Sequence, residues 1–249
     1  MTAAGAGVTA GTPVIGSART QLGAQVRLGK MARSSSSGSS RLDFDALYRG
    51  ESPGEGLPAV TTPPWDTKAP KENVIAWQTA GWVHGDVVDM GCGLGDNAIY
   101  LAQHGYRVTG LDISPTALIT AERRAADAGV DVKFAVADAT TLHDYTNAFD
   151  TVIDSGMFHC LDDDGKRSYA AAVHRATRPG ATLLLSCFSD ANPPDEQWPR
   201  PAVSEQTLRE VLGGAGWDIA SLQPVTVRRE LDGNEVEMAF WYLRAHRRD

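Results

Sequence analysis

The amino-acid sequence predicts an α/β protein built on a seven-stranded, mostly parallel sheet with helices on both faces. From about residue 87 onward, short apolar segments alternate with amphipathic ones, which is typical of parallel strands joined by helical crossovers. Two longer strand-like segments, about 217–229 and 235–245, flank Asp232-Gly233-Asn234, a strong hairpin signal. The sheet is therefore expected to close with a C-terminal antiparallel hairpin.

Local signals mark the individual elements. Ser114-Pro115 can begin a helix, because the serine side chain caps free amides and proline tolerates the first turn, and Gly129 can end it. Ser204 can cap a later helix, and Pro179-Gly180 is expected to stop the helix before that one. The expected helices are 115–128, 166–177 and 204–213, with another beginning near Asp96, and the shorter strands are 87–89, 107–112, 132–136, 151–154 and 182–186.

The composition limits the class of partner. The 249 residues include 23 basic and 31 acidic side chains, a formal net charge of -8. An acidic surface repels phosphate backbones, so a nucleic-acid partner is not expected. The three cysteines, at positions 92, 160 and 187, lack metal-site or disulfide-framework spacing, and no apolar run has the roughly 20 residues of a membrane helix. A cytoplasmic protein with a small-molecule ligand, no metal and no membrane partner is predicted.

Three regions are expected along the chain. Residues 1–40 contain four basic and no acidic residues and lack hydrophobic periodicity, which predicts a disordered basic tail. This composition also suits an organelle transit peptide, although a solvated extension, or translation that begins at Met31, would explain it as well. Residues 41–86 are expected to form an N-terminal helical cover over the carboxyl edge of the sheet, and residues 87–249 the core domain.

A glycine-rich turn after the first core strand is the most informative segment. The sequence from 87 to 95 is an apolar strand followed by three alternating glycines, which let a ligand approach the backbone closely. Gly93 to Ala98 fits the GxGxxA dinucleotide pattern, with Asp112 at a suitable distance, so an NAD-dependent oxidoreductase is one interpretation. Asp89 favours a different interpretation of the turn, because a carboxylate just before the loop repels a pyrophosphate and suits a cationic ligand.

The segment 87–95 resembles motif I of the class I S-adenosylmethionine-dependent methyltransferases. Four later segments resemble further motifs of this family in the same order: 110–114, 137–139, 149–154 and 178–181. The resemblance implies a Rossmann-like sheet and S-adenosylmethionine as the cofactor. It also implies that no metal or covalent nucleophile is needed, since the sulfonium already carries an activated methyl group.

The resemblance carries site residues with it. In the family pattern, the acid at Asp112 holds the ribose hydroxyls, the acid at Asp138 and the following amide read the adenine, and Asp89 orients the loop or the methionyl ammonium. The residues expected to bind the cofactor are Trp65, Asp89, Gly91, Cys92, Gly93, Gly95, Asp112, Ile113, Asp138, Ala139, Asp154 and Ser155.

The methyl acceptor is expected beyond the fourth core strand, at residues 154–161. His159 is the candidate catalytic residue there, as a general base or as a group that orients the acceptor, because its ordinary pKa is close to neutrality. The segment lacks the Asn/Asp-Pro-Pro-aromatic tetrad of methyltransferases that act on nucleobase or glutamine amino groups. Asn192-Pro193-Pro194-Asp195 follows the fifth strand instead and is interpreted as a lid loop. Phe188, Trp198 and Trp241 are candidate aromatic walls.

The N-terminal cover indicates which class of methyl acceptor to expect. Tyr48-Arg49 and the segment 63–70 resemble the cover of small-molecule methyltransferases that act on thiols, thiopurines and heterocycles, with Lys68 where that group commonly has glycine. The resemblance predicts methyl transfer to oxygen, nitrogen or sulfur of a small aromatic or heterocyclic molecule, with a detoxifying role as one possibility. The alternatives are the NAD-dependent oxidoreductase and a non-catalytic cofactor-binding protein. The sequence gives no indication of the oligomeric state.

Overall fold

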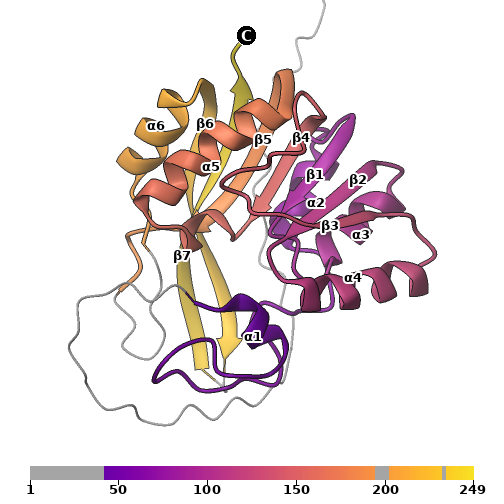
Figure 1. Cartoon of the computed structure of the whole chain (residues 1–249). Coiled ribbons are helices and arrows are strands. Elements are labelled where there is room, and N and C mark those ends of the chain that lie inside the picture. Colours follow the sequence, from indigo (N-terminus) through magenta and orange to yellow (C-terminus); the bar gives the residue numbers. More distant parts are fainter. Residues whose placement is uncertain (1–41, 194–201, 232–233) are drawn as a thin grey trace, which may run out of the picture.

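A seven-stranded sheet forms the centre of the molecule (Figure 1). The computed structural model describes residues 42–193, 202–231 and 234–249. In spatial order the strands are β3 (Lys133–Val136), β2 (Arg107–Asp112), β1 (Asp86–Met90), β4 (Phe149–Ser155), β5 (Thr177–Phe188), β7 (Asn234–Arg247) and β6 (Trp217–Leu231). The α/β prediction is confirmed, with strand boundaries close to those expected.

The strand pairing sets where a ligand can bind. The first five strands are parallel, and β1 lies between β2 and β4, so the chain reverses its direction of winding at β1. Ligands of open α/β sheets bind beyond the carboxyl ends of the strands at such a switch point. The hairpin of β6 and β7 is antiparallel, as predicted, and it extends past Phe188, the last residue of β5, on the side where α1 lies (Figure 1).

The helices of the core begin at polar caps. The Ser114 side chain accepts a hydrogen bond from the Ala117 amide and starts α4 (Pro115–Asp127), and Ser204 caps α6 (Glu205–Gly214) in the same way. The helix α3 (Asp96–Gln103) follows the glycine turn. The helix α5 (Asp163–Ala176) begins three residues before the expected start, because Asp162 is its cap. Pro179-Gly180 does not stop this helix but lies within β5.

Two apolar layers enclose the sheet. One face packs against α5 and α6, where Tyr169, Leu185 and Trp217 are fully buried. The other face packs against α3 and α2 (Glu72–Thr79), and Val74 and Trp77 anchor α2 there. Burying a large apolar side chain contributes about 1.5–3 kcal/mol, so these layers fix the strand ends in place.

The segment before β1 contains α1 (Phe44–Tyr48) and α2, joined by an extended stretch. We call residues 42–85 the cover. In Figure 1, α1 and the chain that follows it lie beyond the carboxyl ends of the parallel strands. The tail 1–40, Asp195 and Trp198 lie outside the described residues. Across the described ranges, every helix is too short or too polar to cross a lipid bilayer, and no cluster of acids, histidines and cysteines has the arrangement of a metal site.

Candidate functional site

The glycine turn between β1 and α3 is shaped for close contact. Gly91, Gly93 and Gly95 all have positive φ, which side chains rarely adopt. A Cβ atom on Gly91 would lie 2.6 Å from Cγ of Met157, and one on Gly93 would lie 2.7 Å from the hydroxyl oxygen of Tyr48. The amides of Gly91 and Cys92 donate to the Leu111 carbonyl at 2.8 and 3.0 Å, which ties the turn to β2. The Cys92 side chain is buried.

Asp112, at the end of β2, joins two loops of the site. Its carboxylate accepts hydrogen bonds from the Gly93 amide at 2.8 Å and from the Ser114 amide at 2.9 Å. Burial raises the pKa of Asp112, and these amide donors oppose the rise. Two backbone donors leave part of the acceptor capacity of the carboxylate unused.

Asp89, on β1, is the least compensated acid of the site. Its side chain is buried, and its Oδ2 atom has no hydrogen-bond partner. Burial raises its pKa well above the ordinary value, and the charges of Asp154 and Asp112 raise it further. An unpartnered buried carboxylate is costly unless a ligand pairs with it.

Asp154 completes a cluster of three buried acids. It ends β4 and accepts hydrogen bonds from the Met157 amide at 2.8 Å and the Phe158 amide at 3.1 Å. Burial raises its pKa to about 6 in spite of these donors. The cluster of Asp89, Asp112 and Asp154 contains no basic side chain among the hydrogen bonds and ion pairs of the described residues, so it favours a positively charged ligand.

The end of β3 lies beside this cluster. The Ala137 amide donates to the Asp112 carbonyl at 2.9 Å, which brings Asp138 and Ala139 next to the β2 loop. The Asp138 carboxylate is exposed and accepts from the amide and hydroxyl of Thr140 at 2.8 and 2.6 Å. Ile113 exposes 51% of its surface here and offers an apolar face beside these polar groups.

The cover closes over the glycine turn. Trp65 is half-buried, and its indole nitrogen donates to the Tyr48 hydroxyl at 2.9 Å. Arg124 of α4 binds both carboxylate oxygens of Asp66 at 3.0 Å and also reaches Asp96 at 2.9 Å, which fastens the cover to α3 and α4. Sequence reasoning selected Trp65, placed Tyr48 in the cover without a role in the site, and missed Arg124.

Asn73, which sequence reasoning also missed, stabilises the strand ends from the cover. Asn73 is buried at the start of α2, and its amide nitrogen lies 3.2 Å from the Ser155 hydroxyl and 3.3 Å from the Ser186 hydroxyl. It therefore links β4 to β5. The Ser155 hydroxyl is occupied by this contact.

His159 lies in a short 3₁₀ turn after β4 (Phe158–Cys160) and is buried. Its Nδ1 atom accepts a hydrogen bond from the Phe188 amide at 3.3 Å. Burial and the nearby Lys166 charge lower its pKa to about 4, so the ring is neutral near pH 7. A neutral imidazole that accepts at Nδ1 carries its proton on Nε2, and in this tautomer the ring is a hydrogen-bond donor.

Aromatic rings form a wall next to this turn. The His159 ring lies 4.6 Å from the Phe188 ring, and Phe188 lies 4.8 Å from Phe240 on β7. Trp241 does not join them. Because neighbouring residues of a strand face opposite sides, its ring packs on the cluster beneath α5 and α6, with its nitrogen donating to the Val203 carbonyl at 2.8 Å.

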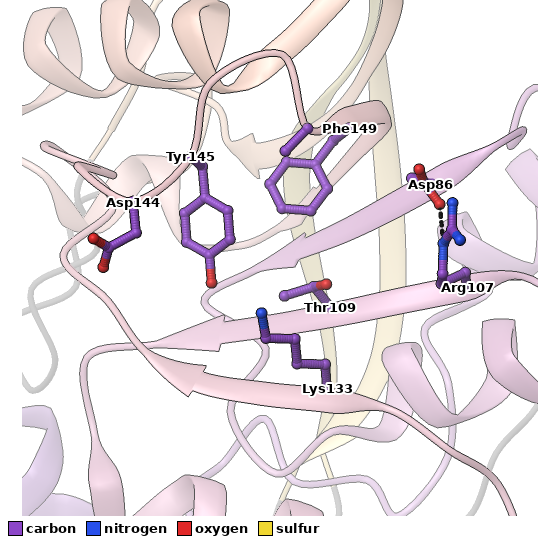
Figure 2. A pocket seen from close by; sticks show the side chains of 8 residues that line it. Asp86, Arg107, Thr109, Lys133, Asp144, Tyr145 and Phe149 are labelled. Atoms are coloured by element: carbon purple, nitrogen blue, oxygen red, sulfur yellow. Dashed lines mark hydrogen bonds and ion pairs between the residues drawn. The ribbon is translucent and has the colours of Figure 1, made fainter.

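A different pocket lies at the opposite, amino end of the sheet (Figure 2). Its lining includes the first residues of β1, β2 and β3, with the Lys133 ammonium 6.0 Å from the centre of the Tyr145 ring. Asp86, at the start of β1, binds Arg107 there, as the dashed line in Figure 2 marks. The buried acids and the glycine turn are therefore not part of this pocket.

The geometry defines a class of site: an α/β sheet with a glycine turn and buried, uncompensated acids that suit a cationic ligand. Residues 87–180 match a family model described as a methyltransferase domain. The 2-heptyl-1-hydroxyquinolin-4(1H)-one methyltransferase of Mycobacteroides abscessus is 37% identical over 222 residues, which cover 82% of this chain and 96% of that protein. The chain belongs to the class I S-adenosylmethionine-dependent methyltransferases.

Solved structures agree with this assignment. One, described as "Conversion of a Disulfide Bond into a Thioacetal Group during Echinomycin Biosynthesis", has 38% identity and a TM-score of 0.71, and the match covers 82% of this chain and 90% of that one. The 1,6-didemethyltoxoflavin-N1-methyltransferase of Burkholderia thailandensis shares the fold, with 23% identity, a TM-score of 0.58 and coverage of 72% and 78%. The protein is therefore an S-adenosylmethionine-dependent enzyme, and the NAD-dependent interpretation of the glycine turn is set aside.

The residues present fit this cofactor. S-adenosylmethionine carries a sulfonium and an ammonium, and the unpartnered Oδ2 of Asp89 is a suitable counter-charge for a cation. The glycine turn has positive φ at three positions and no side chains there, which is the backbone shape that lets a ligand approach closely.

Proposed function

We propose that this enzyme transfers a methyl group to an oxygen, nitrogen or sulfur atom of a small aromatic or heterocyclic molecule. The observation that carries the proposal is the aromatic wall of His159, Phe188 and Phe240 next to the acid cluster. Flat rings pack well against such a wall. The similarity to the quinolone methyltransferase, over 96% of that protein, supports an acceptor of this kind.

For the cofactor, we assign each strand end a part. Asp112 accepts hydrogen bonds from the ribose hydroxyls, Asp138 and the Ala139 amide bind the adenine, and Ile113 packs on its ring. Asp89 pairs with the positive charge of the methionyl part, and Asp154 adds to the negative potential from β4. The proposed binding residues are Trp65, Asp89, Gly91, Cys92, Gly93, Gly95, Asp112, Ile113, Asp138, Ala139, Asp154 and Ser155.

The protein contributes positioning to the reaction. The bound cofactor supplies a methyl group on positively charged sulfur, so the chain has to hold the acceptor atom in line with that bond. Orientation of this kind lowers a barrier by roughly 7–11 kcal/mol. The aromatic wall fixes the plane of the acceptor, and the Nε2 proton of His159 can donate to an oxygen or ring nitrogen on it. The tautomer of His159 therefore favours a role in which the ring orients the methyl acceptor by donating a hydrogen bond to it.

Two broader properties belong to the same proposal. The net charge of -8 favours a small acceptor over a nucleic acid. The described cysteines, Cys92, Cys160 and Cys187, are free thiols, which suits a reducing compartment, and we place the enzyme in the cytoplasm. Methylation of a toxic aromatic compound is a role that fits this chemistry.

An acceptor panel tests the proposal. The enzyme would be incubated with methyl-labelled S-adenosylmethionine and matched acceptors: an N-hydroxyquinolone, a phenol, an aromatic thiol, a ring amine and their non-aromatic counterparts. We expect transfer to at least one aromatic acceptor and none to its saturated analogue. Phe240→Ala should raise the KM for that acceptor about tenfold through lost ring packing, and leave cofactor affinity unchanged. Transfer to saturated acceptors with equal efficiency would contradict the proposed class.

A further inference from the structure

A tyrosine of the cover reaches into the cofactor side of the site. Tyr48 is the last residue of α1, and its hydroxyl oxygen lies so close to the glycine turn that a Cβ atom on Gly93 would be 2.7 Å from it. Gly93 is also the residue whose amide donates to Asp112. The phenol therefore lies beside the backbone and the acid that flank the glycine turn, and not on the aromatic wall of the acceptor side.

Two contacts fix the position of this phenol. Trp65 donates its indole hydrogen to the Tyr48 oxygen at 2.9 Å. The helix that carries Tyr48 is attached to the start of α4, because the Asp45 carboxylate accepts from the Ser114 hydroxyl at 2.6 Å and from the Thr116 amide at 3.0 Å. Ser114 directly follows the β2 loop, so α1 is held against the turn that contains Asp112.

The hydroxyl has a proton left to give. A tyrosine hydroxyl can accept and donate, and Trp65 uses only its acceptor side. No acceptor for the Tyr48 proton occurs among the hydrogen bonds of residues 42–193, 202–231 and 234–249. Burial and the negative charge of Asp112 raise the pKa of Tyr48, so the group keeps its proton across the physiological range. The half-buried hydroxyl is therefore a donor that a ligand oxygen at the glycine turn can accept from.

We propose that Tyr48 is a cofactor-binding residue whose hydroxyl, oriented by Trp65, donates a hydrogen bond to an oxygen on the ribose side of the bound cofactor. The ribose hydroxyls that give their protons to Asp112 keep lone pairs, and these are the acceptors nearest to the phenol. The cover is thus part of the cofactor site itself. This inference rests on the proposed placement of the ribose against Asp112.

The test compares two ligands by calorimetry in the absence of any acceptor. S-adenosylhomocysteine contains the ribose and the methionyl-type chain, whereas 5′-methylthioadenosine contains the ribose but lacks the amino-acid part. Tyr48→Phe keeps the ring and removes the hydroxyl. We expect both ligands to bind about three- to tenfold more weakly, by the same factor, as one net hydrogen bond predicts. Trp65→Phe, which removes the indole N–H that orients the hydroxyl and keeps an aromatic ring, should weaken both by a smaller factor.

A matched control uses another tyrosine. Tyr100→Phe removes a hydroxyl of α3 that donates to Gln78 of α2, and it should leave both affinities unchanged. Unchanged binding in Tyr48→Phe, or a loss confined to S-adenosylhomocysteine, would overturn the inference. Asp112→Ala checks the ribose placement separately: if it leaves 5′-methylthioadenosine binding intact, the placement is wrong whatever Tyr48 does. Melting temperatures without ligand identify variants that fail to fold.

Discussion

The two ends of β1 place an aspartate in opposite electrostatic surroundings. Asp86 opens the strand and pairs with Arg107 and with Arg178, the latter at 3.0 Å, and the Arg107 hydrogen bond lowers its pKa. Asp89 lies three residues further along, has no partner for Oδ2, and burial raises its pKa. Figure 2 shows the paired end, with Arg107 directed at Asp86.

The difference separates structural acids from ligand-binding acids. At the amino end, Asp150 is also paired, with Arg178 at 2.7 Å, so that end is internally neutralised. At the carboxyl end, three buried acids face one another without a basic partner among the described contacts, which destabilises the free protein at neutral pH. A protein keeps such groups where a ligand pairs with them, and in the function we propose the cationic cofactor is that ligand.

Removing an acid from the ligand-binding end should have the largest effect. Asp112→Ala deletes the acceptor of the ribose hydroxyls, each worth about 1.5–3 kcal/mol as a charge-assisted hydrogen bond. We expect S-adenosylmethionine affinity, measured by calorimetry, to fall at least tenfold while the circular dichroism spectrum stays that of the wild type. A variant that binds the cofactor with wild-type affinity would refute the assignment of Asp112.

Neutralising the two acids of β1 should change stability in opposite directions. Asp86→Asn removes ion pairs of a carboxyl whose folded pKa is lowered, and such a group stabilises the fold above its unfolded pKa of about 3.9. The melting temperature should fall by about 2–4 °C at pH 7. Asp89→Asn removes a carboxyl whose folded pKa is raised. Such a carboxyl lowers the stability of the fold as the pH rises from its unfolded pKa through its folded pKa. The melting temperature of Asp89→Asn should therefore rise at pH 7.

The two variants Asp86→Asn and Asp89→Asn should also differ in their affinity for the cofactor. Asp89→Asn is expected to weaken S-adenosylmethionine, and Asp86→Asn to leave it unchanged. The stability gain of Asp89→Asn should also shrink as the pH is lowered toward the unfolded pKa of about 3.9, because a carboxyl whose folded pKa is raised no longer costs stability once it is protonated in both the folded and the unfolded state. Thermal melts from pH 5 to 8 measure this trend. A gain that is independent of pH would mean that packing, and not charge, causes it.

The parts of this site that could be predicted from sequence are those set by local structure. A strand, three glycines and the helix that follows them specify the turn around Gly93, and Asp112 occupies a fixed place at the end of the next strand. Tyr48 and Arg124 could not be found in this way, because the cover between 42 and 85 has no hydrophobic period and reaches the site only through tertiary contacts. The side on which Trp241 lies depends on the register of β7, which composition does not reveal.

The protonation state of His159 could not be predicted from the sequence either. A histidine with an ordinary pKa just after β4 would suit a general base, and removing a general base lowers the reaction rate by about 10²–10⁴-fold. The folded chain lowers its pKa to about 4 and occupies Nδ1 with an amide from Phe188, 29 residues away in the chain. The pKa shift arises from burial and from the charge of Lys166 on α5, and the amide contact arises from packing against β5.

The smallest predicted effect follows from this environment. As a neutral donor, His159 should contribute one hydrogen bond to acceptor orientation, so His159→Ala should lower kcat/KM about tenfold and leave cofactor affinity unchanged. His159→Gln, which can place an amide donor near the Nε2 position, should recover part of that loss. Between pH 6 and 9 the rate should follow the ionisation of the acceptor in the wild type and both variants alike, because the histidine stays neutral throughout. A loss of 10² or more with a protonated acceptor, together with no loss for one already ionised, would instead identify His159 as the base, since only the first acceptor then needs its proton removed.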